Sequence, residues 1–224
     1  MAQALVVFSG GQDSTTCLLW ALKKFDSVQA IFFDYGQRHK IEVNCARKIC
    51  QLLKVPLLET PISSLKSVAA HNALMNPDLE IQSGQAGLPN TFVPGRNALF
   101  LSLAASYAST QNIDNIVLGV CETDYSGYPD CRQAFIASMQ KSLSLAMEKN
   151  FGFHTPLMKL NKAQTFQMAA QYAGLELVIK ESHTCYEGKR KDLHEWGYGC
   201  GKCPACQLRR TGYQDYLMLG QHHA

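Results

Sequence analysis

An octapeptide rich in glycine and hydroxyl side chains, SGGQDSTT at Ser9–Thr16, directly follows the apolar run ALVVF. Such residues after a buried strand are typical of a loop that holds phosphate. The loop has no lysine, whereas the common G-x-x-x-x-G-K-[ST] loop needs one to reach the β- and γ-phosphates. The G-x-G-x-x-G pattern also fails, because Gly10 and Gly11 are adjacent and no third glycine follows. The sequence therefore predicts a phosphate site of another kind.

The chemistry of this loop does not depend on either pattern. Adjacent glycines let the backbone approach a ligand closely, and free N–H groups at the start of the next helix attract an anion. Ser9, Ser14 and Thr15 add hydroxyl donors. Asp13 would repel phosphate unless a cation lies between them, so its presence favours Mg²⁺. A glycine pair alone often marks an ordinary strand-to-helix turn, but the longer S-G-G-x-D-S pattern is far more specific.

Four of the nine cysteines form a group near the C-terminus: Cys185, Cys200, Cys203 and Cys206. The C-x2-C-x2-C spacing lets one turn wrap a tetrahedral ion, and the fourth thiolate would complete a structural Zn²⁺ site with no position open for water. An iron–sulfur cluster is one alternative, because thiolates alone also hold such clusters. Replacement of one thiolate by His183 or His194 is another.

Short apolar runs that alternate with helical patterns predict the scaffold around the loop. In the first half we expect strands at 4–8, 28–33 and 55–60, and helices at 14–24 and from residue 41 onward, with an apolar stripe of Ile41, Cys45, Ile49 and Leu52. In the second half we expect helices at 96–110, along the stripe Phe135, Met139, Leu143 and Met147, and from an Asn161 cap to about residue 173, with strands at 115–120 and within 151–158. This βαβα order predicts an α/β doubly wound parallel sheet.

Two regions are expected along the chain. Residues 1–178 are expected to form the α/β domain with the phosphate loop, with a polar loop at 121–132 after the fourth strand, and residues 179–224 to form a small zinc-binding segment with a terminal helix. Residues 65–94 mix polar residues with Gly and Pro, and we expect an irregular excursion there.

The composition excludes several classes of protein. A hydrophobic fraction of 46% with 17% charged residues describes a folded chain, not a disordered one. No apolar run approaches the roughly 18–20 residues of a membrane span, and no leader is visible, so we expect a cytoplasmic protein without a membrane partner. The net charge of +3 resides between Lys180 and Arg210, which hold seven basic and four acidic residues. A nucleic-acid-binding protein usually has a wider basic field, so we interpret this window as a solvated charged loop.

The S-G-G-x-D-S loop after an N-terminal strand resembles the PP-loop of the N-type ATP pyrophosphatases. These include GMP, NAD and asparagine synthetases and tRNA-modifying enzymes. The resemblance implies that the loop holds the β- and γ-phosphates of Mg-ATP. It also implies cleavage between the α- and β-phosphates, so that a substrate oxygen becomes adenylated.

Six segments narrow the resemblance. They are VVFSGGQDSTTCL, FDYGQRH, TFVPGRN, GVCETDYSGYPDCR, TPLMKLNKAQT and TCY…CGKCPAC, and in this order they resemble the bacterial 7-cyano-7-deazaguanine synthases from about Leu5 to Tyr213. The resemblance implies synthesis of a nitrile from 7-carboxy-7-deazaguanine, ammonia and ATP in the queuosine pathway, through an adenylated carboxylate and an adenylated amide. It also implies a homodimer. One departure is the gap of 14 residues between Cys185 and Cys200, which is longer than the family pattern.

The same resemblance implies roles for individual residues. Those expected around ATP are Phe8, Ser9, Gly10, Gly11, Gln12, Asp13, Ser14, Thr15, Thr16, Phe33, Tyr35 and Gln37. Those expected to be catalytic are Asp13, Ser14, Arg96, which would neutralise charge on the α-phosphate, and Lys162, which would contact phosphate. Those expected around the deazaguanine are Glu122, Asp124 and Asp130 on its N–H edge, Tyr125 and Tyr128 in stacking, and Arg132 on its carboxylate. The four cysteines are expected to hold zinc.

Two other functions remain open at this point. One is a PP-loop tRNA-modifying enzyme with an iron–sulfur cluster, which would bind RNA in a salt-dependent way. The other is a non-catalytic nucleotide-binding α/β module with a structural zinc, which would bind ATP without releasing pyrophosphate.

Overall fold

A computed structural model describes the chain except for residues 38, 66–71, 75–78, 80–87, 123–126 and 222–224. Its central sheet has five parallel strands in the order β3-β2-β1-β4-β5. The strands are β1 (Gln3–Val7), β2 (Ser27–Asp34), β3 (Leu57–Pro61), β4 (Asn115–Leu118) and β5 (Gly152–His154). The predicted parallel sheet is confirmed, and all five strands coincide with the apolar runs.

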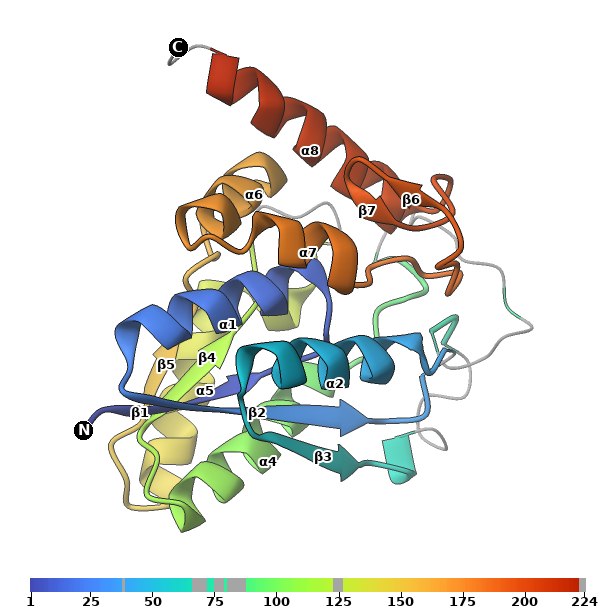
Figure 1. Cartoon of the computed structure of the whole chain (residues 1–224). Helices are drawn as coiled ribbons and strands as arrows, with labels where there is room; N and C mark the ends of the chain where they lie inside the picture. Colours follow the sequence, from blue (N-terminus) through green and yellow to red (C-terminus); the bar gives the residue numbers. More distant parts are fainter. Residues whose placement is uncertain (38, 66–71, 75–78, 80–87, 123–126, 222–224) are drawn as a thin grey trace.

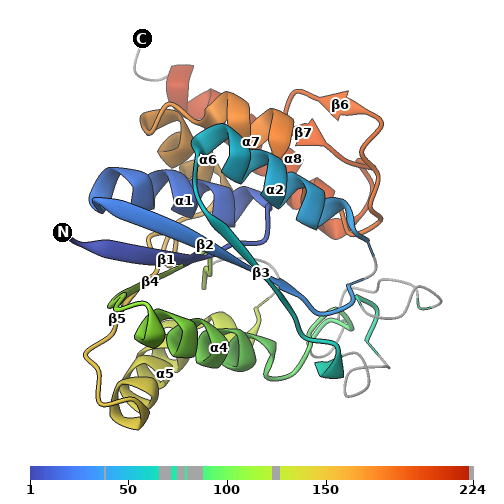
Figure 2. The same cartoon turned by 60° about the horizontal axis from the view of Figure 1, so that its bottom comes forward.

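Helices cover both faces of this sheet (Figure 1, Figure 2). One face carries α1 (Gln12–Lys24), α2 (Ile41–Leu53), α6 (Lys162–Gln171) and α7 (Leu175–Glu181), and the other carries α4 (Arg96–Thr110) and α5 (Gln133–Ala146). Because side chains alternate along a strand, Val6 of β1 packs with Leu18 and Ile49 in one core, while Leu5 packs with Leu101 in the other. The doubly wound arrangement is therefore confirmed. None of the described helices combines the length and apolar character needed to cross a membrane.

The strand order places the glycine loop at a reversal point of the sheet. From the central strand β1 the chain first builds β2 and β3 on one side and later returns to build β4 and β5 on the other. Ligands of open α/β sheets bind beyond the carboxyl ends of the strands at such a point. The loop that starts at Ser9 leaves β1 at this end of the sheet.

Helix boundaries agree with the sequence signals more closely than the helix faces do. Asn161 caps α6 as predicted, because its side chain accepts the Gln164 N–H at 2.9 Å and the Gln164 side chain accepts the Asn161 N–H. The predicted stripe of α2 is wrong at Leu52, which is 48% exposed, since the buried face turns toward Val43 and Ala46 instead. The short helix α7 was missed, and the expected boundary at residue 178 falls inside it.

The long gap between Cys185 and Cys200 contains a small antiparallel hairpin, β6 (Leu193–His194) with β7 (Gly197–Tyr198). The terminal helix α8 (Pro204–Gln221) then packs along α6 (Figure 1). At the crossing, a Cβ placed on Gly212 of α8 would lie 2.3 Å from Cβ of Lys162, so only glycine allows this approach. Most of the expected 65–94 excursion lies outside the described residues.

Two basic residues of the C-terminal window are structural, and the interpretation of that window as a solvated loop is wrong for them. Arg209 is 1% exposed and donates to the Val178 carbonyl at 2.8 Å, the Trp196 carbonyl at 2.8 Å and the Thr184 hydroxyl at 2.7 Å. Arg190 donates to the carbonyls of residues 180–182, where the last turn of α7 leaves carbonyls without helical partners. These guanidinium groups fasten α7, the hairpin and α8 to one another.

We predict that Arg209→Met lowers the free energy of unfolding by about 3 kcal/mol or more, because two buried carbonyls and the partly buried Thr184 hydroxyl lose a charged donor at once. The matched control is Arg210→Met, since Arg210 is the exposed neighbour on the same helix. Thermal unfolding of both variants would measure the difference. Equal melting temperatures would contradict the structural role of Arg209.

Candidate functional site

A cavity of about 320 Å³ opens beyond the carboxyl ends of β1, β2 and β4. It is the place where most of the predicted ATP-binding residues meet. Those on its wall are Phe8, Ser9, Gly11, Gln12, Asp13, Ser14, Phe33, Tyr35 and Gln37. The wall also includes Arg96 from the first turn of α4 and Tyr128 from the predicted substrate loop.

The corner between β1 and α1 is held by two hydroxyl contacts and by the close approach of Gly119. The Ser9 and Ser14 hydroxyls lie 3.1 Å apart, and the Gly11 N–H donates to the Ser9 hydroxyl at 3.3 Å. Gly119, just after β4, lies so close that a Cβ there would be 2.9 Å from the Ser14 nitrogen. The absence of a side chain at Gly119 thus keeps the start of α1 open toward the cavity. An open helix N-terminus with two hydroxyl groups beside it can bind an anion.

Gly10 has a φ of 76° and holds this corner against two other segments. A Cβ on Gly10 would lie 2.7 Å from the Ala46 nitrogen and 2.8 Å from the Glu42 carbonyl oxygen, both in α2. Its carbonyl accepts the His183 N–H at 2.9 Å. Gly10 is therefore required for packing and does not itself line the cavity.

Thr15 and Thr16 also stand apart from the cavity wall. The Thr15 hydroxyl donates to the Gly11 carbonyl at 2.7 Å, and the Thr16 hydroxyl donates to the Gln12 carbonyl at 3.0 Å. Both side chains are buried within α1. Their hydroxyl groups are thus engaged by their own helix.

Asp13 and Lys162 form an ion pair of 2.7 Å between Oδ2 and Nζ. Lys162 is 9% exposed, which rules out the ordinary solvated lysine of a first helical turn. The other carboxylate oxygen of Asp13, Oδ1, is buried and has no hydrogen-bond partner among the described residues. The aspartate thus presents one paired and one free oxygen, a suitable donor for a cation that accompanies phosphate.

Aromatic side chains form the wall beyond β2. Phe33 stacks on Phe100 with ring centroids 4.6 Å apart, and the Tyr35 N–H donates to the Gln37 side-chain oxygen at 3.1 Å. The guanidinium of Arg96 lies 5.9 Å from the centroids of both Tyr35 and Phe100. Its buried Nε has no hydrogen-bond partner within the described parts of the chain. A flat base and an anionic group would both find suitable surfaces here.

Among its described residues, the predicted substrate loop meets the cavity at Cys121, Tyr128 and Cys131. The Tyr128 hydroxyl lies 2.7 Å from that of Thr91. Asp130 is buried, and its Oδ2 accepts the Asn97 N–H of α4 at 3.2 Å. Glu122 accepts the Gln133 N–H of α5 at 3.0 Å. Both carboxylates therefore stabilise helix N-termini and do not line the cavity.

The other predicted residues of that loop are Arg132, Asp124 and Tyr125. Arg132 is exposed and lies at the N-cap of α5, away from the wall. Asp124 and Tyr125 lie outside the described residues.

Sequence reasoning missed a further set of wall residues. They are His39, Glu42, Asn97, His183, Thr184 and Tyr186. Burial raises the pKa of Glu42 to about 7, although the charge of Arg96 lowers it in part. Burial also lowers the pKa of His183 to about 4, which keeps its imidazole neutral. No spacing rule indicated these residues, because three separate segments bring them together.

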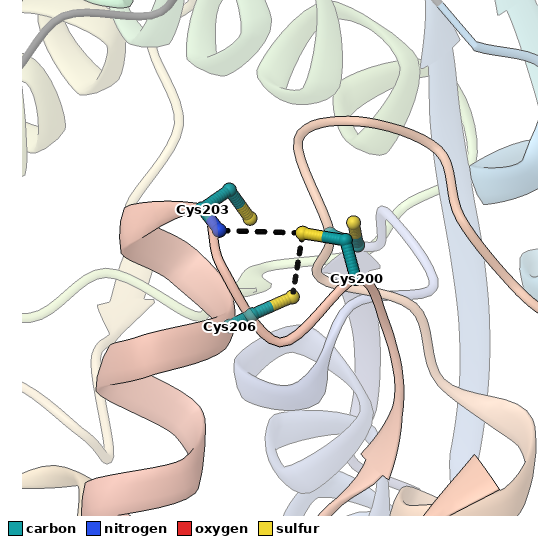
Figure 3. Close-up of side chains that lie close together, drawn as sticks. Cys200, Cys203 and Cys206 are labelled. Atoms are coloured by element: carbon teal, nitrogen blue, oxygen red, sulfur yellow. Dashed lines mark hydrogen bonds between the residues drawn. The ribbon is translucent and has the colours of Figure 1, made fainter. Parts of the chain in front are cut away.

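The four predicted cysteines meet at the start of α8, with their sulfur atoms within 4.8 Å of one another. Figure 3 shows the Cys203 N–H donating to the Cys200 sulfur at 3.2 Å, and the Cys200 and Cys206 sulfurs 3.9 Å apart. Thiolates on one tetrahedral ion at about 2.3 Å would lie about 3.8 Å apart, so the group fits a single metal. His183 and His194 are not members of this group, which makes the alternative of a histidine ligand wrong.

The electrostatics of the cluster favour a cation. Hydrogen bonds from the Cys203 and Cys206 thiols lower the pKa of Cys185. The interaction with Cys185 in turn raises the pKa of Cys203 to about 11 and raises the pKa of Cys206. Several thiolates so close together cannot coexist without a positive charge among them, and a divalent metal supplies that charge.

Comparison with known proteins agrees with this geometry. The family model described as "Queuosine biosynthesis protein QueC" matches residues 3–217. A 7-cyano-7-deazaguanine synthase of Helicobacter pylori (strain Shi470) is 49% identical over 215 residues, covering 94% of this chain and 95% of the relative. A second, of Nitratidesulfovibrio vulgaris (strain DP4), is 50% identical over 225 residues, covering 96% and 93%.

A solved structure of a 4-thiouridine synthetase in complex with RNA and ATP shares the fold, with a TM-score of 0.51 and 15% identity over 99% of this chain and 53% of that one. The family match over nearly the full length, together with the glycine corner and the four-cysteine group, identifies the chain as a member of the QueC family of queuosine biosynthesis proteins, whose relatives are 7-cyano-7-deazaguanine synthases.

Proposed function

We propose that the chain is an ATP-dependent carbon–nitrogen ligase that converts 7-carboxy-7-deazaguanine and ammonia to 7-cyano-7-deazaguanine. The observation that carries the proposal is the glycine corner, open toward a cavity with the Asp13–Lys162 pair beside it, in a chain of the QueC family. A carboxylate oxygen and an amide oxygen are both poor leaving groups. Attachment of AMP to each in turn converts them into good ones, so two ATP molecules are consumed per nitrile.

The start of α1 is proposed to hold the β- and γ-phosphates. The Ser9 and Ser14 hydroxyls and the N–H groups that follow Gly10 face the cavity without a side chain at Gly119 to cover them. Mg²⁺ bound to the free Oδ1 of Asp13 would offset the charge of pyrophosphate. Lys162 keeps the Asp13 carboxylate oriented and adds a positive charge at the corner. Pyrophosphate is stabilised there as it leaves the α-phosphate.

The aromatic wall is proposed to hold the nucleoside, with Phe33, Tyr35 and Gln37 around the base and ribose. Arg96 lies between this wall and Tyr128, where the α-phosphate must pass from ATP to the substrate. Its unpartnered Nε can donate to a phosphate oxygen as charge develops.

The deazaguanine is proposed to bind beyond Arg96, near Tyr128 and the rest of the 121–132 loop. Glu122, Asp124, Tyr125, Asp130 and Arg132 remain candidates of unequal support, since Asp130 and Glu122 already accept helix N–H groups. Tyr128 has the strongest support, because its ring lines the cavity.

The metal of the cysteine group is proposed to be structural Zn²⁺, held by four thiolates with no position open for chemistry. Sulfur atoms around a four-iron cluster would need to stand farther apart than the observed 4.8 Å limit, which favours a single ion. We further propose the division into an ATP-binding domain at 1–178 and a zinc-binding segment at 179–224, and a cytoplasmic homodimer. The family resemblance supports the last of these.

The proposal predicts the products of a single assay. Purified protein with Mg-ATP, ammonium and 7-carboxy-7-deazaguanine should yield nitrile, AMP and pyrophosphate, with two AMP per nitrile. Mass spectrometry of the nucleobase and chromatography of the nucleotides would measure this. ADP as the main nucleotide product would contradict the proposed cleavage between the α- and β-phosphates.

Asp13→Ala should reduce nitrile formation at least about 10²-fold, because the corner loses its cation ligand and Lys162 loses its partner. The metal content should stay near one ion per chain, since Asp13 is not a member of the cysteine group. Asp215→Ala, at an exposed position of α8, is the matched control and should keep full activity. Undiminished activity of Asp13→Ala would remove this residue from the site.

Elemental analysis tests the metal. Native protein should carry one zinc per chain and no visible absorbance, and Cys206→Ser should lose the metal and unfold at a lower temperature. Cys50→Ser, at a buried cysteine outside the group, should retain it. Bound iron with visible absorbance would instead favour a cluster.

A further inference from the structure

A second set of polar side chains lines the cavity without a role at the phosphate corner: Gln12, Glu42, His183 and His39. They come from the start of α1, the first turn of α2, the segment after α7 and the loop after β2. The backbones of three of these segments converge on Gly10. The Glu42 carbonyl would lie 2.8 Å from a Cβ there, and the His183 N–H donates to the Gly10 carbonyl at 2.9 Å.

This set contains polar atoms that nothing described in the chain satisfies. The Gln12 side-chain oxygen and one nitrogen of a neutral imidazole accept hydrogen bonds, whereas the Gln12 side-chain nitrogen and the other imidazole nitrogen donate them. Gln12 is 0% exposed and His183 is 2% exposed, yet the Gln12 amide and both imidazole nitrogens of His183 have no partner among the described residues. Nε2 of His39 also has no hydrogen-bond partner among the described residues. Glu42 forms no ion pair with any described residue. Buried polar atoms without partners cost free energy, so a ligand that supplies N–H donors would bind here.

The proposed reaction supplies such a ligand, and the inference rests on that proposed function. Its nitrogen enters as ammonium, with four N–H bonds, and leaves as a nitrile, with none. A phosphate group would be repelled by the Glu42 carboxylate, whereas ammonium carries the opposite charge and only donors. The four protons must pass to a base that faces the nitrogen at each stage.

We propose that Glu42 is the catalytic base that takes these protons, while Gln12 and His183 hold the nitrogen beside it. The carboxylate first takes one proton from ammonium. As the C–N bond of the amide forms, AMP departs with the electrons of the C–O bond, and a second proton leaves the nitrogen. The amide oxygen then attacks the α-phosphate of the second ATP, pyrophosphate departs as the bond between the α- and β-phosphates breaks, and the nitrogen loses a third proton. Finally the second AMP departs with the electrons of the C–O bond as the last proton leaves the nitrogen and the C≡N bond forms, and each proton passes on to solvent.

The charges around Glu42 suit a base that works near neutral pH. Burial raises the pKa of Glu42 to about 7, and Arg96 of α4 opposes part of that rise. A base with this pKa is ionised often enough to accept a proton and basic enough to retain it. The other titratable or charged groups on the cavity wall are Asp13, Tyr35, His39, Cys121, Tyr128, Cys131, His183, Cys185 and Tyr186. Burial raises the pKa of Cys45 in the same helix, and the charges of Glu42 and of Glu181 in α7 raise it further. The charge of Arg190, which follows α7, lowers that pKa.

The Glu42→Gln variant tests the proposal, because it should slow the removal of protons from nitrogen without slowing adenylation of the acid. Acid-dependent exchange of labelled pyrophosphate into ATP needs no nitrogen, so it should stay within about threefold of the native rate. Ammonium-dependent nitrile formation should fall about 10²–10⁴-fold. Hydroxylamine, which is largely uncharged at neutral pH, should still capture the adenylate as hydroxamate with less than about a tenfold loss, since it needs less help from a base. The matched control is Glu176→Gln, at an exposed position of α7, which should behave as native in all three assays.

Each other outcome has a distinct meaning. Loss of the exchange in Glu42→Gln would overturn the inference, because Glu42 would then hold ATP or the acid. Retained ammonium-dependent turnover would overturn it as well. No acid-dependent exchange in the native protein would refute the proposed function itself, and the inference with it.

Native protein provides a second measurement that does not require the variant to fold. Amide formation from the preformed adenylate, at a constant concentration of ammonium, should increase with pH through about 7 and then level off, because only ionised Glu42 accepts a proton. A rate that keeps rising about tenfold per pH unit above pH 7 would show that free ammonia reacts without this base and would overturn the inference. Glu42→Asp, which retains a carboxylate, should recover part of the activity that Glu42→Gln loses. A rate independent of pH between about 6 and 8 would overturn the inference.

Discussion

The structure depends on the contact between the glycine corner and two segments that are distant in the sequence. Gly10 has a positive φ and no side chain, so the backbone of the corner lies closer to α2 than it could if position 10 carried a Cβ. The Gly10 carbonyl accepts a hydrogen bond from the segment after α7. The phosphate corner, α2 and the cysteine segment thereby form one continuous wall. Any larger residue at position 10 would separate the acceptor-rich side chains from the phosphates, so the same contact serves binding and chemistry.

The cavity divides its polar groups by charge, which explains how two ATP-dependent steps share one site. Hydroxyl and N–H donors lie at the phosphate corner beside the Asp13–Lys162 pair, and Arg96 adds a cation, while the Glu42 carboxylate lies on the part of the wall that includes Gln12 and His183. The triphosphate and the nitrogen source carry opposite charges, so each is attracted to a different part of the wall. The substrate acid must lie between them, within reach of both the α-phosphate and the nitrogen. Under the proposed function, the wall itself would order the three substrates.

The sequence was sufficient for features that depend on local rules. Each strand of the sheet was a short apolar run, Asn161 was a residue type that caps helices, and the cysteine group followed metal-ligand spacing. It failed where the outcome depends on tertiary contact. The exposure of Leu52 follows from how α2 rotates on the sheet, and the burial of Arg209 follows from carbonyls on three other segments. Glu42 and His183 carry no motif, because only the fold brings them to one cavity.

Cys185 belongs to two structures at once, since it is a member of the four-cysteine group and also lines the cavity beside Thr184 and Tyr186. Oxidation of these thiols to disulfides, or loss of a metal that they hold, would displace this stretch and so alter the cavity wall. The shape of the cavity therefore depends on the oxidation state of sulfur atoms at the start of α8.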